Sequence, residues 1–235
     1  MNNRWHEIWN KRIGNVRCLN NDEFTLYKEL KRLDGFDVNV NDEDNYYKTF
    51  YQAMQNLYRK HLADVSSVFE VGCGSGANLL LLKNNGLEIA GLDYSENLVS
   101  VANNVLNLDN CIICDEAINI PVMPGYDAVL SDSVFAYFSN YEYAMTVLEK
   151  MYKKSNNRII ICEILDKDKE KECIAYRKSM LENYDEIYKG LEKLFYPRCF
   201  FEQFALDHNC KIEFSDVYNE YYWNSDYMYN CIISK

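Results

Sequence analysis

A glycine-rich turn and a nearby carboxylate are the residues of this sequence whose types and spacing could do chemistry. An apolar run with strand character ends in glycines at alternate positions, Gly72, Gly74 and Gly76, and a helical run follows at once. Glycine permits positive φ and leaves no Cβ in a ligand's path, while a helix N-terminus presents unpaired N–H groups. The next short apolar run ends in Asp93, which is placed to accept both hydroxyls of a ribose. Together, the two stretches predict a nucleoside-binding site.

The spacing of the glycines separates this site from two phosphate-binding patterns. A dinucleotide fingerprint needs G-x-G-x-x-G and a phosphate loop needs G-x-x-x-x-G-K-[ST], and neither pattern is met here. The order Glu70, Gly72, Gly74, Gly76, followed by Asp93 after the next strand, resembles the first two motifs of the class I S-adenosylmethionine-dependent methyltransferases. The resemblance covers roughly residues 66–235. It implies an α/β, Rossmann-like fold with a seven-stranded, mostly parallel sheet, helices on both faces and an antiparallel last strand.

The same resemblance implies S-adenosylmethionine as the cofactor and indicates which residues hold it. Glu70, Gly72 and Gly74 would form the loop at its methionine end, Asp93 would bind the ribose, and Asp115 would meet the adenine. The complete predicted cofactor-binding set is Glu70, Gly72, Cys73, Gly74, Gly76, Asp93, Tyr94, Asp115, Glu116, Ala117 and Ser131, with Trp5 and Trp9 as a candidate cover.

The charge balance bears on the methyl acceptor. The chain of 235 residues carries 36 acidic and 25 basic side chains, a formal charge of -11, and no dense Lys/Arg cluster. A nucleic-acid substrate would need a basic track for its phosphates, so a small molecule is the expected acceptor and nucleic acid is disfavoured. No apolar run approaches the ~20 residues of a membrane-spanning helix and no signal peptide is evident. We therefore expect a soluble, cytoplasmic monomer or homodimer without a membrane partner.

Nine cysteines are scattered along the chain, and Cys111 with Cys114 forms the one CxxC pair. Positions three apart on a strand face opposite sides of the sheet, so this pair could not chelate a metal without a turn. The sequence predicts buried, reduced thiols and no metal site.

The periodicity, together with what the family resemblance implies about the core and the insertion, predicts one domain made of four parts. These are an N-terminal helical cap (1–62), a cofactor-binding core (66–165), a substrate-side insertion (166–196) and a last helix with two strands (197–235). The predicted strands are 68–71, 87–92, 111–114, 126–130, 158–165, 211–217 and 228–233. After the first helix, the sequence predicts helices over 22–33, 96–106, 141–152 and 197–208. It also predicts one helix that ends near residue 62 and one that begins at residue 79.

Two segments allow alternative interpretations. The first helix carries Trp5 and Trp9 on one face, which either pack on the domain or close over the ligand. The charged stretch 166–190 is either a solvated helix face or a substrate-covering segment, and Tyr176 with Arg177 is then its inward polar pair.

Methyl transfer requires positioning of donor and acceptor more than acid–base catalysis, and positioning can supply ~7–11 kcal/mol of the barrier. A hydroxyl acceptor also needs a base. The candidate catalytic residues are His6, Tyr137 and Glu163, with Asp132 as an alternative base. The candidate substrate-binding residues are Tyr137, Tyr176, Arg177, Tyr222 and Asn224.

The acceptor atom stays open between oxygen and nitrogen. The expected substrate is a sugar, a sugar-nucleotide or surface-polysaccharide precursor, or a secondary metabolite. The alternatives are an RNA or protein methyltransferase and a non-catalytic S-adenosylmethionine-binding scaffold.

Overall fold

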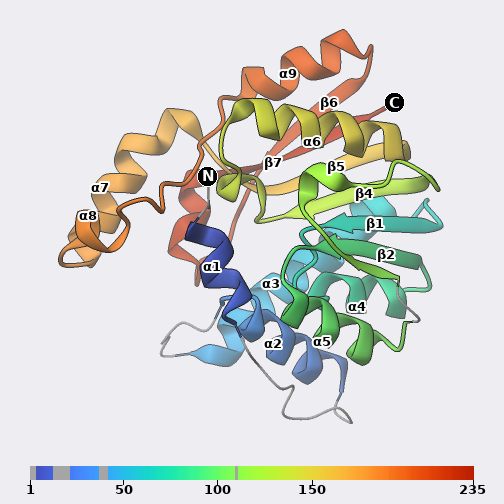
Figure 1. Ribbon diagram of the computed structural model, residues 1–235, viewed down its shortest axis with the longest axis horizontal. Coiled ribbons are helices and arrows are strands. Elements are labelled where there is room, and N and C mark those ends of the chain that lie inside the picture. The colour runs from blue at the N-terminus through green and yellow to red at the C-terminus, as the bar shows by residue number, and fades with distance from the viewer. Residues whose placement is uncertain (1–3, 13–21, 37–41, 109–110) are drawn as a thin grey trace.

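A seven-stranded sheet of order β3-β2-β1-β4-β5-β7-β6 forms the centre of the protein (Figure 1). The computed structural model describes residues 4–12, 22–36, 42–108 and 111–235. Strands β1 to β5 pair in parallel, and β7 runs antiparallel to both β5 and β6. The strands are β1 Ser67–Val71, β2 Glu88–Asp93, β3 Ile112–Cys114, β4 Tyr126–Asp132, β5 Ser155–Leu165, β6 Lys211–Asp216 and β7 Met228–Ser234. The predicted sheet with its antiparallel last strand is confirmed.

Strand alternation divides the hydrophobic core into two layers, one on each face of the sheet. In β4, Ala128 and Leu130 belong to one cluster of buried side chains and Val129 to the other, as period-two side chains require. Helices α2 Glu23–Leu33, α3 Glu43–Leu57, α4 Ala77–Asn84 and α5 Glu96–Leu106 cover the first face. Helices α6 Tyr141–Lys154 and α9 Arg198–Asp207 cover the second (Figure 1).

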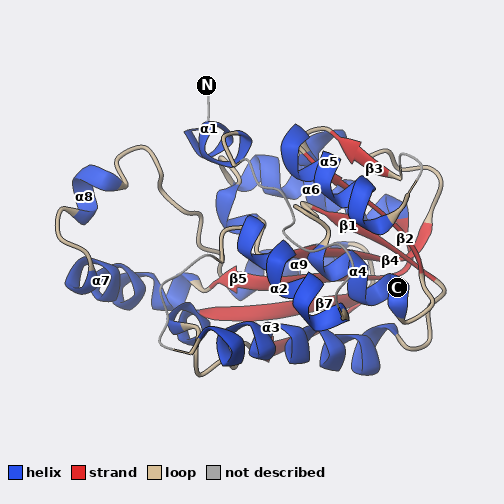
Figure 2. Cartoon of the chain, turned by 90° about the horizontal axis from the view of Figure 1, so that it is seen from below, coloured by secondary structure: helices blue, strands red, loops and turns tan. Residues whose placement is uncertain are grey.

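The remaining helices gather near the carboxyl ends of the parallel strands. They are α1 Arg4–Asn10, α7 Glu170–Met180 and α8 Tyr184–Ile187. Figures 1 and 2 agree that α7 and α8 project beyond the carboxyl end of β5. The single turns are η1 Tyr58–Leu62, η2 Ala117–Asn119, η3 Phe135–Tyr137, η4 Lys167–Lys169 and η5 Trp223–Tyr227. The predicted elements therefore form close to their expected bounds, and the stretch 166–190 divides into two helices. No helix among the described residues is long and apolar enough to cross a membrane.

The cysteines correct one expectation. Cys111, Cys114 and Cys199 are exposed, whereas Cys73, Cys162, Cys173 and Cys231 are buried as predicted. Cys111 precedes β3 and Cys114 ends it; β3 is an edge strand that pairs only with β2, so its outer edge is left open. Cys18 lies outside the described residues. Within the described ranges, no group of three or more side chains is arranged to hold a metal ion.

The turn after β1 depends on Gly72, whose φ is +74° and whose missing Cβ would lie 2.3 Å from Val134 Cγ2. We expect Gly72→Ala to lower the free energy of unfolding by about 2–4 kcal/mol, because it combines left-handed backbone strain with overpacking. Urea denaturation measures this loss. Gly86→Ala is the matched control, since Gly86 has a φ of +86° and an added Cβ there would meet no atom within 4 Å. Equal losses in both variants would show that the Val134 contact contributes nothing.

Candidate functional site

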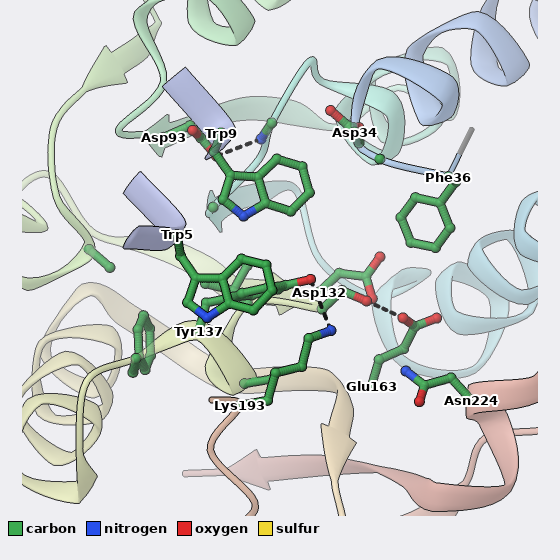
Figure 3. A pocket seen from close by; sticks show the side chains of 18 of the residues that line it. Trp5, Trp9, Asp34, Phe36, Asp93, Asp132, Tyr137, Glu163, Lys193 and Asn224 are labelled. Carbon is green, nitrogen blue, oxygen red and sulfur yellow. Dashed lines mark hydrogen bonds between the residues drawn. The ribbon is translucent and has the colours of Figure 1, made fainter. Parts of the chain in front are cut away.

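A cavity of about 650 Å³ lies at the carboxyl ends of β1, β2, β4 and β5. Ligands of open α/β sheets bind at this edge, and the volume falls within the usual range of about 300–1,000 Å³ for small-molecule sites. The glycine-rich turn, the four strand ends, α1, the end of α2, α7 and η5 all contribute to its lining. Figure 3 shows aromatic and carboxylate side chains facing one another across it.

Asp93, the last residue of β2, is held rigidly at one end of this cavity. Its Oδ2 accepts the Gly74 N–H at 2.9 Å and its Oδ1 accepts the Ser95 N–H at 2.8 Å. Burial raises the pKa of Asp93, and the two backbone hydrogen bonds oppose that shift. Each carboxylate oxygen keeps acceptor capacity, so Asp93 can take the two hydroxyls of a ribose.

Two buried acceptors face the cavity beside the glycine-rich turn. Asn78 Nδ2 donates to Glu70 Oε1 at 2.8 Å and to Asp132 Oδ2 at 2.9 Å. Among the described residues, Glu70 Oε2 and Asn78 Oδ1 have no hydrogen-bond partner. Buried oxygens of this kind normally find a donor, and an ammonium group supplies three. The pair fits the ammonium at the methionine end of S-adenosylmethionine.

Tyr94, next to Asp93, forms another part of the cavity lining with His6 and Glu116. The His6 ring of α1 stacks on the Tyr94 ring at a centroid distance of 4.1 Å, and His6 Nε2 lies 2.5 Å from Glu116 Oε1. Asp115 lines the rim, where Asn119 and the Glu116 N–H each donate to its Oδ1 at 2.7 Å. Hydrogen bonding with Asn119 lowers the pKa of Asp115. This part of the cavity offers an aromatic face and an acidic rim to a nucleobase such as adenine.

Helix α1 covers the cavity without burying any side chain in the core. Trp5 and Trp9 contact the Tyr137 ring edge-on, at centroid distances of 4.9 Å and 5.7 Å. Trp5 Nε1 also donates to the Glu192 carbonyl at 3.3 Å. These contacts favour the interpretation of α1 as a cover over packing alone.

We expect the double variant Trp5→Ala and Trp9→Ala to raise the dissociation constant of S-adenosylhomocysteine about tenfold, because the aromatic wall over the cavity is lost. Calorimetric titration measures the change. Ile8→Ala is the control, since Ile8 is an exposed residue of the same helix outside the cavity lining. An unchanged dissociation constant in the folded double variant would show that the tryptophans of α1 only pack on the domain and do not cover the ligand.

Asp132 at the end of β4 and Glu163 near the end of β5 form a second pair of acids in the cavity. Cys162 belongs to one face of the core and Ile164 to the other, because a bulge shifts the β5–β7 register between Ile161 and Ile164. Glu163 sits at this shift with a φ of +55°. Its carboxylate accepts a hydrogen bond from Ser133 Oγ. Strain of this sort concentrates at functional sites.

Glu163 is ionisable near neutrality. Burial, followed by the charge of Asp132, raises the pKa of Glu163 to about 7. Lys31 Nζ lies 3.4 Å from Asp132 Oδ2 and sits over the Phe36 ring at 4.6 Å, so one buried cation partly offsets this acid group. A carboxylate poised near neutral pH is suited to accept a proton from an acceptor amine or hydroxyl.

Three buried acids make the expected pH dependence of stability unusual. Burial raises the pKa of Asp34 to about 7, of Glu70 to about 8 and of Glu163 to about 7. Between about pH 4 and pH 8 the folded state keeps protons that the unfolded state releases, so stability falls as pH rises. We expect the melting temperature of the ligand-free protein to decrease from pH 5 to pH 8.5, and Glu70→Gln to flatten that decrease. A melting temperature that rises over this interval would contradict the assignment.

The structure brings most of the predicted site together. The predicted residues that line the cavity are Trp5, His6, Trp9, Glu70, Gly72, Cys73, Gly74, Asp93, Tyr94, Asp115, Glu116, Ala117, Tyr137, Glu163, Tyr176, Arg177, Tyr222 and Asn224. Gly76 and Ser131, which were also predicted, do not line it. Gly76 instead starts α4 and makes room for Ala102 and Leu106. Ser131 Oγ donates to the Val71 carbonyl at 3.1 Å.

Several cavity residues were not identified from the sequence, among them Lys31, Asp34, Asn78 and Lys193. Lys31 lies four residues after Tyr27, one turn along the buried face of α2. A charged residue at such an inward position could have indicated a site. Asp34 Oδ1 accepts the Ser75 N–H at 2.7 Å and lies 2.4 Å from where a Cβ on Gly74 would be. The second glycine of the turn therefore makes room for Asp34.

Comparisons with known proteins agree with this geometry. A family model described as "Methyltransferase domain" matches residues 69–157. An uncharacterized methyltransferase of Staphylococcus carnosus (strain TM300) is 24% identical over 162 residues, which cover 68% of this chain and 75% of that protein. The 18S rRNA (guanine-N(7))-methyltransferase bud23 of Schizosaccharomyces pombe is 30% identical over 77 residues, 32% of this chain and 29% of that protein. Magnesium protoporphyrin IX methyltransferase of Synechocystis PCC 6803, with bound S-adenosylhomocysteine, has a TM-score of 0.60 at 17% identity and covers 91% of this chain and 98% of its own.

The sheet order and the solved neighbours show that the chain has the class I methyltransferase fold. Residues 69–157 match the methyltransferase family model, and a solved neighbour of the same fold is a methyltransferase with bound S-adenosylhomocysteine. Both findings agree with the family resemblance and with the S-adenosylmethionine cofactor expected from the sequence.

Proposed function

We propose that the protein transfers the methyl group of S-adenosylmethionine to an amine or hydroxyl of a small molecule that binds beneath α1. The observation that carries the proposal is one cavity that joins Asp93 and the glycine-rich turn to Glu163, a carboxylate with a pKa of about 7. Tyr137, Tyr222 and the α1 tryptophans give this cavity aromatic walls suited to a small acceptor.

The roles of the chain's own residues follow from their positions. When bound, S-adenosylmethionine supplies an electrophilic methyl carbon. Asp93 orients the ribose, and Glu70 with Asn78 holds the ammonium at the methionine end. Glu163 takes the proton that the acceptor nitrogen or oxygen loses, while the Ser133 hydroxyl fixes the orientation of that carboxylate. Helix α1 excludes water from the reacting groups.

The charge of the chain supports a small acceptor over RNA. The match to an rRNA methyltransferase is the observation that favours RNA, and it covers less than a third of either chain. Against it stand the formal charge of -11 and the lack of a dense Lys/Arg cluster in the sequence that could follow the phosphates of an RNA backbone. A sugar or sugar-nucleotide precursor and a secondary metabolite are the small molecules that we propose to test, in a cytoplasmic protein acting as a monomer or homodimer.

Calorimetric titration with S-adenosylhomocysteine, followed by a methyl-transfer screen against sugar nucleotides and small amines, tests the proposal. Micromolar binding and transfer to at least one small molecule are expected. Failure of the folded protein to bind would contradict the cofactor site, and binding without any transfer would favour a non-catalytic scaffold. Transfer to RNA alone, with affinity falling steeply as salt rises, would favour the RNA alternative.

A further inference from the structure

Two cations at the acceptor end of the cavity have no carboxylate partner among the described residues. Lys193 Nζ donates to the Tyr137 hydroxyl at 3.3 Å and lies over the rings of Tyr137 and Trp5, at 4.7 Å and 5.7 Å from their centroids. Arg177 Nη2 donates to the Asn224 amide oxygen at 3.1 Å. Both cations are therefore held by neutral groups.

Burial makes this arrangement costly without a ligand. Arg177 is only 9% exposed, and its Nε has no hydrogen-bond partner within the described part of the chain. A buried charge is normally paired, and acids outnumber bases 36 to 25 in this chain. Lys31, the other buried cation of the cavity, does pair with Asp132. Arg177 lines the cavity, and its buried Nε has no acidic partner that the structure describes.

The two cations act on the same region of the site. Burial raises the pKa of Cys173, and the charges of Arg177 and Lys193 both oppose that rise, so both lie near this thiol. Lys193 also acts on the pKa of Glu163, which it lowers. Figure 3 shows the side chains of Lys193, Glu163 and Asn224 pointing toward a shared space. An acceptor in that space would meet Glu163 as a base and the positive charges of Lys193 and Arg177.

We infer that the methyl acceptor carries an acidic group, a carboxylate or a phosphate, which Lys193 and Arg177 bind while Glu163 faces the reacting amine or hydroxyl. This inference rests on the proposed function and deepens it by naming a substrate class. Guanidinium and ammonium groups bind both anions through charge-assisted hydrogen bonds, which are the stronger kind. Arg177 also lies over the Trp223 ring at 5.2 Å, which holds its guanidinium in place.

A competing role for Lys193 is to balance the charge of Glu163 alone. That role would alter the pH dependence of catalysis and would give no preference for acidic ligands. It also leaves unexplained why the buried Nε of Arg177 has no partner among the described residues. A binding measurement on matched ligands separates the two roles without relying on turnover.

The experiment titrates the protein loaded with S-adenosylhomocysteine with pairs of probes that differ by one acidic group. Tyrosine against tyramine and 4-hydroxyphenylacetate against 4-ethylphenol test a carboxylate. O-phosphoethanolamine against ethanolamine tests a phosphate. We expect the acidic member of at least one pair to bind about tenfold more tightly or better, since hydrogen bonds to charged groups are at stake. The pair that shows this preference identifies the anion.

Variants assign the preference to its residues. Lys193→Met and Arg177→Met should each reduce it to less than threefold while S-adenosylhomocysteine binding is retained. Lys171→Met is the control, because Lys171 is exposed on the same helix as Arg177 and lies outside the cavity lining. Equal affinities within every pair, or a preference that survives both substitutions, would overturn the inference. Failure of S-adenosylhomocysteine to bind would instead contradict the proposed function, and titrating the probes into the unloaded protein then tests the anion site alone.

Discussion

Replacing Glu163 by glutamine should lower kcat about a hundredfold or more, with little change in the affinity for S-adenosylhomocysteine. A positioned general base typically contributes about 10²–10⁴ to the rate. Glutamine keeps the shape of the side chain and can still accept from Ser133, so the loss isolates the proton-accepting charge. Initial rates with the acceptor found in the screen measure the effect.

The pH profile of this variant decides the assignment. In the wild type, Glu163 must be ionised to act, so kcat should rise with pH and level off above about 7, the pKa that burial gives this side chain. The rise of kcat with pH should be absent in Glu163→Gln. Glu142→Gln, an exposed acid on α6, should behave like the wild type. A Glu163→Gln enzyme that keeps both its rate and its rise with pH would show that another group takes the proton.

Asp93→Ala should raise the dissociation constant of S-adenosylhomocysteine more than tenfold. The substitution removes charge-assisted hydrogen bonds to the ribose, each worth about 1.5–3 kcal/mol. It also releases the Gly74 and Ser95 N–H groups that now anchor the turn. Calorimetry measures the affinity, and thermal melting checks that the variant folds.

Two further variants sharpen the test of Asp93. Asp93→Asn keeps the side-chain volume and should fall between wild type and alanine, because a neutral amide oxygen accepts more weakly. Asp207→Ala removes an exposed acid at the end of α9 and should leave affinity unchanged. Wild-type affinity in a folded Asp93→Ala protein would exclude Asp93 from the ribose site.

The sequence was sufficient for the fold and for the cofactor end of the site because both depend on local pattern. Short apolar runs broken by glycine or acid marked the parallel strands, and the carboxyl end of each strand fixed where its next residue would lie. Asp93 was found in this way, since it directly follows an apolar run. The family resemblance then supplied the cofactor.

Glu163 is a candidate base from the sequence alone, but the assembly of the acceptor end could not be predicted, because tertiary contacts create that end. Glu163 reaches the cavity through a bulge, and nothing in an apolar run indicates a change of register. Lys193 lies in an irregular segment with no periodicity to give its direction. Asp34 follows α2 and meets the glycine-rich turn 41 residues further along the chain. Such positions depend on how separate elements dock, and sequence spacing does not record that.

The docking of Asp34 against Gly74 has a consequence for how the molecule folds. Side chains of α2 and α3, including Tyr27, Leu30 and Phe50, share one hydrophobic cluster with Val68 of β1 and Leu79 of α4. The Ser75 hydroxyl donates to the Leu30 carbonyl at 2.9 Å, which adds a buried polar link. We therefore expect the helices before the sheet and the glycine-rich turn to unfold together, because the contacts that hold the turn come from those helices.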